Sequence, residues 1–274
     1  LDNIEKKKLK EINVISGDIC DSDFILKETK KIDLIFHLAA LISIPYSYES
    51  PRSYIATNVE GTLNILEAAK LNNVKKIINT STSEVYGSAQ KIPIDESHQL
   101  SAQSPYAATK ISADQLSMSY HRSFNLPVTI LRPFNTFGPR QSLRAAIPTI
   151  ISQIILGKKE IKLGNLKSTR DFTYVSDTVE GYVKTIKNNK CLGETINLGT
   201  GYDFSIKRTV DLICEILQKD VKIITDKKRI RPKKSEVNRL IGSSTSARKY
   251  LNWKPKHINK RGFILSISKT YKWF

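Results

Sequence analysis

Two different spacings of apolar side chains alternate along the first half of the chain. Short β-branched or apolar runs predict strands at residues 11–16, 33–37, 74–80 and 128–132. Apolar side chains at helical spacing predict a helix over residues 53–71, and a second helical pattern covers residues 104–124, where Ser104-Pro105 favours a helix start. Strands that alternate with helices predict a parallel sheet wound with helices.

The second half of the chain has a different character. Its patterns predict two strands at residues 195–198 and 221–225, and four helices at residues 147–156, 177–187, 205–217 and 245–251. Ser205 is suited to cap the third of these helices. Residues 1–133, with parts of 170–200, are therefore assigned to the wound sheet, and residues 134–274 mainly to a second lobe.

Composition excludes several classes of protein. Hydrophobic residues make up 40% of the 274 residues, which is enough for a core, and no run of about 18 apolar residues predicts a membrane helix. The polar, Lys-rich residues 1–10 do not form a signal peptide. The cysteines and histidines are scattered, so we expect a reducing cytoplasm and no metal site: Cys20, Cys191, Cys214, His37, His98, His121 and His257.

The formal net charge of +18 could attract nucleic acid, an anionic membrane or an anionic substrate. Basic residues are spread along the chain, however, with short runs only at residues 6–8 and 227–231. No recognition motif or alternation of aromatic and basic residues accompanies them. We interpret the charge as Lys-rich solvated surface and predict no nucleic-acid partner.

Tyr106 and Lys110 are the first candidates for chemistry. Four residues apart on a helix, they share one face, and a nearby ammonium favours the phenolate by lowering the tyrosine pKa. Such a tyrosine can take a proton from a sugar hydroxyl as hydride leaves the same carbon. Tyr250 and Lys254 have the same spacing, but Pro255 follows and no long helix is predicted there, and a solvated helix face is the simpler explanation for them.

The preceding strand end distinguishes Tyr106 from that second pair. Thr80 is followed by Ser81, Thr82, Ser83 and Glu84. Ligands of wound parallel sheets bind beyond the carboxyl ends of the strands, so the Thr82 hydroxyl and the Glu84 carboxylate are expected close to Tyr106. An ordinary polar turn would explain the same residues, since serine and threonine favour turns.

As an ordered set, these residues resemble the extended short-chain dehydrogenases, the NAD-dependent epimerase/dehydratase family. The resemblance spans nearly the whole chain. It rests on Thr82, on Tyr106 with Lys110, and on further motifs: Gly17-Asp18-Ile19, His37-Leu38-Ala39-Ala40, Asn58 with Gly61-Thr62, Arg132-Pro133-Phe134-Asn135-Thr136-Phe137-Gly138-Pro139, Arg170-Asp171-Phe172-Thr173-Tyr174-Val175, and Arg231-Pro232.

The resemblance implies an α/β fold, a Rossmann-like doubly wound parallel sheet with a smaller C-terminal α/β substrate lobe. It also implies NAD as cofactor, a nucleotide-sugar substrate, and a homodimer formed through the Tyr106 helix. Thr82, Ser83, Glu84, Tyr106 and Lys110 would be catalytic. The implied cofactor contacts are Asp18, Ile19, Leu38, Ala39, Ala40, Thr57, Thr80, Tyr106, Lys110 and Pro133, and the implied substrate contacts are Asn135, Arg144, Lys162, Arg170 and Arg231.

Two reactions of that family start alike, with removal of the C4 hydroxyl proton and loss of the C4 hydride. A 4-epimerase returns the hydride to C4, whereas a 4,6-dehydratase also needs a base for the C5 proton and an acid for the leaving C6 hydroxyl. The triplet of Thr82, Ser83 and Glu84 is similar to that of the dehydratases, with Glu84 as the base. Ser83 stands where the glucose-type enzymes carry Asp. The wider sequence resembles the N-acetylglucosamine-nucleotide dehydratases of legionaminic-acid-type pathways.

One family motif has no counterpart in the sequence. Its 12 glycines form no Gly-x-x-Gly-x-x-Gly run, the turn that lets helix N-terminal amides reach a dinucleotide diphosphate. The resemblance therefore implies that a first β-α-β segment of about 50 residues is missing, and we expect NAD binding by this chain to be weak or absent. A non-catalytic NAD-binding or RNA-binding relative is the rival class.

Overall fold

The computed structural model describes residues 4–274. Its main sheet has the order β1-β2-β3-β7, and all neighbouring strands are parallel. The strands are β1 (Leu34–His37), β2 (Lys76–Thr80), β3 (Val128–Pro133) and β7 (Thr195–Leu198). Four strands predicted from the sequence are thereby confirmed, and the last of the first-half runs extends one residue further, to Pro133.

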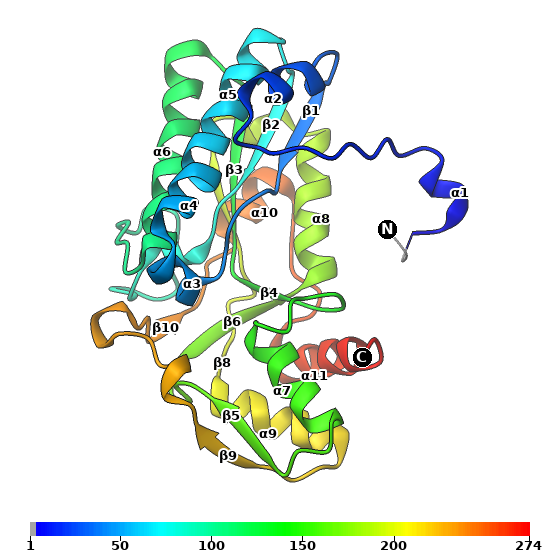
Figure 1. Cartoon of the computed structure of the whole chain (residues 1–274), viewed down its shortest axis with the longest axis vertical. Helices are drawn as coiled ribbons and strands as arrows, with labels where there is room; N and C mark the ends of the chain where they lie inside the picture. Colours follow the sequence, from blue (N-terminus) through cyan, green and yellow to red (C-terminus); the bar gives the residue numbers. More distant parts are fainter. Residues whose placement is uncertain (1–3) are drawn as a thin grey trace.

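Helices cover both faces of this sheet (Figure 1). On one face, α5 (Gly61–Leu71) lies between α2 (Ser22–Glu28) and α6 (Pro105–Phe124), and Ile77 of β2 packs there. On the other face, α8 (Val175–Ile186) and α10 (Thr245–Leu251) cover a cluster that contains Ile78 of β2. Successive side chains of a strand point to opposite faces, so β2 is buried on both sides.

The helix that carries Tyr106 begins where the sequence predicts. The Ser104 hydroxyl accepts a hydrogen bond from the Ala107 N–H at 3.1 Å, and Pro105 occupies the first turn. The helix predicted over residues 53–71 starts earlier and is interrupted. It consists of α4 (Pro51–Ile55), a π-helical turn (Ala56–Glu60) and α5, and a short α3 (Ile44–Glu49) precedes it.

Below the main sheet in Figure 1 lies a second group of elements. Its small sheet contains β10 (Arg239–Leu240), β6 (Thr169–Tyr174), β4 (Asn135–Phe137) and β8 (Asp203–Ser205), while β5 (Glu160–Leu163) pairs with β9 (Lys222–Thr225). The helices α7 (Ala146–Ile155), α9 (Ile206–Leu217) and α11 (Asn259–Tyr271) share one apolar core with them. The Ser205 cap is confirmed, since its hydroxyl accepts from the Arg208 N–H at 3.0 Å.

One strand predicted from the sequence is wrong, and one helix of the second group was not predicted. Residues 11–16, which lie between α1 (Lys6–Leu9) and α2, form no strand. Val14, in the middle of this segment, is 61% exposed. A strand needs a neighbour to receive its backbone hydrogen bonds, and within residues 4–274 the only strand beside β1 is β2. Helix α11 was not predicted because its sequence is largely polar, yet Phe263 and Ile267 anchor it in the second core.

The remaining short elements are 3₁₀ turns, at Ser83–Tyr86, Asn189–Cys191, Lys227–Arg229 and Lys233–Ser235. Across the described part of the chain, the helices are too short or too polar to span a bilayer.

Candidate active site

The turn that follows β2 places three candidate residues against α6. Thr82 caps the 3₁₀ turn Ser83–Tyr86, and its hydroxyl accepts from the Glu84 N–H at 3.3 Å. Ser83 and Glu84 are both buried. The tight turn therefore directs this polar segment inward, in contrast to an ordinary solvated turn.

Tyr106 and Lys110 are also buried, and they face this turn. The Lys110 ammonium donates to the Thr80 carbonyl, and a hydrogen bond joins the Thr82 hydroxyl to Tyr106. The structure thus brings Thr80, Thr82, Tyr106 and Lys110 together at the carboxyl end of β2. The second Tyr/Lys pair is different, because α10 ends at Leu251, before Lys254.

Burial dominates the electrostatics of the pair. It raises the pKa of Tyr106, and Glu84 raises it further, whereas the Thr82 hydrogen bond lowers it. The pKa of Lys110 is lowered by burial, an effect that Asp114 opposes. The sequence predicted a lowered pKa for Tyr106, and that prediction is wrong for this structure, because desolvation of the phenolate outweighs the stabilising contacts.

Two residues that sequence reasoning did not assign to the site support it from the preceding helix. Tyr54 is fully buried, and its ring contacts Tyr106 edge to face with centroids 6.3 Å apart. The Asn58 side chain donates to Thr109 of α6 at 3.1 Å and bonds both backbone groups of Leu41, at 2.8 and 2.9 Å. Asn58 thereby fixes the segment after β1 relative to α6.

A charged cluster forms the other wall of the site. The Arg231 Nη1 lies 3.3 Å from the Glu84 Oε2, and the Arg170 Nη2 lies 3.7 Å from the Glu236 carboxylate. Burial lowers the pKa of Arg170, an effect that the nearby Glu84 charge opposes. Residues from three distant parts of the sequence therefore meet here, and Arg170 and Arg231 lie beside the predicted base.

The remaining predicted substrate residues differ in their placement. Asn135 begins β4, and its buried Oδ1 has no hydrogen-bond partner among residues 4–274, so it can accept from a ligand. Arg144 is exposed. Burial raises the pKa of Tyr54, and the Arg144 charge partly opposes that effect, which places Arg144 near the site. Lys162 is exposed on β5, and its backbone N–H bonds Gln153 at 2.9 Å. No contact described for Lys162 joins it to the cluster.

Some of the predicted cofactor residues line an open cleft of about 610 Å³ at the end of β1. Four of them contribute to its walls: Asp18, Ile19, Leu38 and Ala39. Ala40 follows directly, Thr57 lies on the π-helical turn, and Pro133 ends β3. Burial holds the pKa of His37 at about 3, so its neutral ring bonds Thr62 at 3.0 Å and ties β1 to α5.

Possible metal ligands form no cluster in the described part of the chain. Residues 4–274 contain no group of three or more His, Cys, Asp and Glu side chains that could hold an ion.

The family model described as GDP-mannose 4,6 dehydratase matches residues 1–262. The chain belongs to this family. Its relatives include the dTDP-D-glucose 4,6-dehydratase of Homo sapiens, 33% identical over 271 residues that cover 95% of this chain and 74% of the relative.

Solved structures of the same family share the fold. A UDP-N-acetylglucosamine 4-epimerase from Methanobrevibacter ruminantium, 32% identical, superposes with a TM-score of 0.88 over 100% of this chain and 86% of that one. A dTDP-glucose 4,6-dehydratase from Streptomyces venezuelae, with NAD bound, is 26% identical, with a TM-score of 0.85 over 94% and 77%. The fold is therefore α/β and Rossmann-like, within a family of nucleotide-sugar 4,6-dehydratases and 4-epimerases.

The residues of this chain fit both nucleoside parts of NAD. The cleft beside β1 combines apolar walls with the Asp18 carboxylate, which suits an adenosine, and the Lys110 ammonium at the carboxyl end of β2 is a donor to which a ribose hydroxyl could bind. For the diphosphate between them, the sequence offers no Gly-x-x-Gly-x-x-Gly turn.

Proposed function

We propose that this protein is an NAD-dependent nucleotide-sugar 4,6-dehydratase that acts on a UDP- or GDP-linked N-acetylglucosamine-like sugar. The observation that carries the proposal is the position of Glu84. Its carboxylate is buried in the same site as Tyr106, close enough to raise the pKa of that tyrosine. Transfer of a hydride at C4 alone does not require this carboxylate, whereas removal of the C5 proton does.

In this proposal Tyr106 takes the proton of the C4 hydroxyl, and Thr82 donates a hydrogen bond to the same oxygen. Lys110 holds a positive charge beneath them and helps to hold the cofactor ribose. NAD supplies a reversible acceptor for the C4 hydride. Glu84 then takes the C5 proton, and Ser83, directly beside it, relays a proton through water to the leaving C6 oxygen. The hydride taken from C4 would then return from the cofactor to C6, so the reaction consumes no oxidant.

The charged cluster is suited to the nucleotide part of the substrate. Arg170 and Arg231 present planar guanidinium groups, which bind phosphate oxygens in a bidentate manner. The Asn135 side-chain carbonyl oxygen, which has no partner among the described residues, can accept from a hydroxyl group of the sugar nucleotide. Arg144 and Lys162 would lie further out, and residues 134–274 would form most of the substrate lobe. We place this reaction in cell-surface polysaccharide synthesis in the cytoplasm, carried out by a homodimer.

The experiment is incubation of the purified chain with NAD and UDP-N-acetylglucosamine or a GDP-linked counterpart, followed by mass spectrometry of the sugar nucleotide. A 4-keto-6-deoxy product has lost one water, and its appearance supports the dehydratase. The Tyr250→Phe variant is the matched control, because it carries the other Tyr/Lys spacing outside the site. NAD is supplied at a concentration that saturates a weak site, and no mass change with any of these substrates would then count against the proposal.

A 4-epimerase is the second candidate, favoured by one specific contact. The Glu84 carboxylate pairs with Arg231 at 3.3 Å, so Glu84 could serve to hold that arginine for the nucleotide instead of removing the C5 proton. An epimerase product has the mass of its substrate but the opposite configuration at C4. Nuclear magnetic resonance of the sugar protons therefore separates the two reactions.

A further inference from the structure

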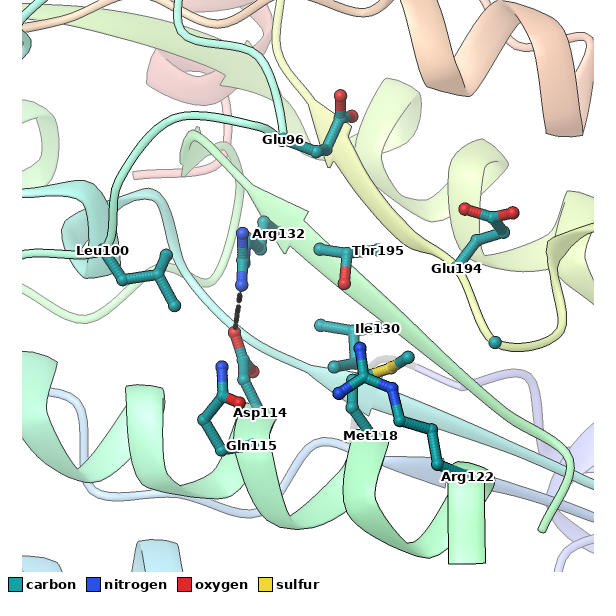
Figure 2. Close-up of a pocket in the computed structure, with 11 residues that line it drawn as sticks. Glu96, Leu100, Asp114, Gln115, Met118, Arg122, Ile130, Arg132, Glu194 and Thr195 are labelled. Carbon is teal, nitrogen blue, oxygen red and sulfur yellow. Dashed lines mark hydrogen bonds and ion pairs between the residues drawn. The ribbon is translucent and has the colours of Figure 1, made fainter. Parts of the chain in front are cut away.

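A buried ion pair lies directly beneath the Tyr106–Lys110 pair. The Arg132 Nε and Nη2 atoms donate to the Asp114 Oδ2 at 3.0 and 2.9 Å, and the two side chains are 5% and 1% exposed. The Ser81 hydroxyl donates to the same oxygen at 2.7 Å. Figure 2 shows the pair among the residues that line a pocket, which has a volume of about 350 Å³. Burying such charges costs desolvation free energy, so the pair is a poor source of stability alone.

Asp114 is placed where three parts of the candidate site meet. On α6 it lies four residues after Lys110 and eight after Tyr106, so all three share one helix face. Ser81 directly precedes Thr82, and Arg132 lies on β3 three residues before Asn135. A single carboxylate oxygen therefore joins α6 to the ends of both strands.

The same network also fixes the far end of the turn that contains Glu84. The Arg132 Nη1 donates to the Tyr86 hydroxyl at 2.9 Å, and this hydroxyl donates to the Asn197 Oδ1 at 2.8 Å. The Arg132 guanidinium also lies 5.0 Å from the centre of the Tyr86 ring. Both ends of the segment from Ser81 to Tyr86 are thus held by contacts that lead to Asp114.

The charge of Asp114 acts on both members of the catalytic pair. Burial lowers the pKa of Lys110 and Asp114 opposes that effect, while burial raises the pKa of Tyr106 and Asp114 adds to it. The other groups that face the pair are His37 from β1, Glu84 after β2 and Tyr54 from α4, with Arg132 of β3 facing Asp114 itself. Removing one negative charge lowers the pKa of every neighbouring group.

We propose that Asp114 is a positioning residue for this site. Through Ser81 and Arg132 it holds the strand ends that carry Thr82 and Asn135 in place against α6, and its charge sets the pH range in which the Tyr106–Lys110 pair works. Asp114 touches neither substrate nor cofactor. The kinetic part of its test rests on the proposed function, because it needs turnover of a nucleotide sugar.

The test compares three variants of the full chain. Asp114→Asn removes the charge, Ser81→Ala removes one donor without a change of charge, and Glu67→Gln is the matched control. Glu67 of α5 is also a carboxylate that contacts α6, where it accepts from the Tyr120 hydroxyl. Tyr120 lies far along α6 from Tyr106, so this contact is remote from the candidate site. Steady-state kinetics are measured as a function of pH.

In Asp114→Asn we expect kcat to fall on the order of 10²-fold, as for a misplaced catalytic group, with little change in KM. Both limbs of its pH profile should move to lower pH. Ser81→Ala should lower kcat without moving either limb, and Glu67→Gln should change neither quantity. A reduced kcat with both limbs at their wild-type positions in Asp114→Asn would overturn the electrostatic role.

Hydrogen exchange of the resting protein separates this proposal from the proposed function. Amides of residues 80–86 and 132–135 should exchange faster in Asp114→Asn and Ser81→Ala than in Glu67→Gln. If the wild type turns over no nucleotide sugar, the proposed function fails while faster exchange still supports the positioning role. Unchanged exchange in Ser81→Ala, which keeps the ion pair and its fold, would refute that role.

Discussion

Substitution of Glu84 by Gln tests the proposed dehydration step directly. Glutamine has nearly the same shape, and its carbonyl oxygen can still accept from the Arg231 guanidinium that now lies 3.3 Å away. It cannot accept the C5 proton. A positioned general base contributes a factor of roughly 10² to 10⁴, so we expect formation of the dehydrated product to fall by that factor. This corresponds to about 3–5 kcal/mol of transition-state free energy.

The assay has two readouts because C4 oxidation precedes the lost step. Reduced nicotinamide, followed by its absorbance, should still form in Glu84→Gln, since Tyr106, Thr82 and Lys110 are unchanged. Loss of water, followed by mass spectrometry, should not keep pace with it.

The control is Glu236→Gln, which alters the other carboxylate of the charged cluster. Glu236 pairs with Arg170 at 3.7 Å, so its loss should affect KM more than the water-loss step. Wild-type rates of water loss in Glu84→Gln would refute the assignment of the base. Equal loss of both readouts would show that Glu84 instead serves C4 oxidation.

Three further predictions follow from the contacts described. Tyr106→Phe should suppress both C4 oxidation and water loss in the same assays, and equal losses in Tyr250→Phe would mean that the wrong pair was chosen. The pKa of His37 is held at about 3 in the folded chain against 6.5 unfolded. The unfolded state therefore binds the extra proton, so stability from a neutral His37 is present above pH 6.5 and is lost as pH falls toward 3, by at most about 1.4 kcal/mol per pH unit. Urea midpoints should show this slope, and His37→Gln should flatten it. Ser104→Ala should lower the free energy of unfolding by about 1 kcal/mol, because it removes the cap of α6, whereas the exposed Ser119→Ala should not lower the urea midpoint.

Local patterns predicted the main sheet well because its strands are buried on both faces. Such strands are short continuous apolar runs, and Ile77 and Ile78 of β2 pack on opposite sides. The helix start at Ser104-Pro105 was also readable, since capping is a local interaction. The strand predicted at residues 11–16 did not form, because a β-branched run becomes a strand only where the fold provides a neighbouring strand.

The candidate site was predictable only in part, for a similar reason. The strand-end segment containing Thr82 and the spacing of Tyr106 and Lys110 are sequence patterns, so their proximity could be expected. The raised pKa of Tyr106 could not be predicted from the sequence, since it depends on burial. Asp114 was missed, although an acidic residue one turn after Lys110 on a buried helix face was a signal that could have indicated it.

The outer edge of β1 has a practical consequence for work with this protein in solution. Within residues 4–274 the strand is paired only with β2, and Leu38 and Ile42 beside it are 63% and 67% exposed. An open strand edge next to apolar side chains is a template for intermolecular pairing. Self-association should therefore grow with protein concentration and be relieved by a lysine in place of Ile42, so the colloidal behaviour of the purified chain is set by this edge.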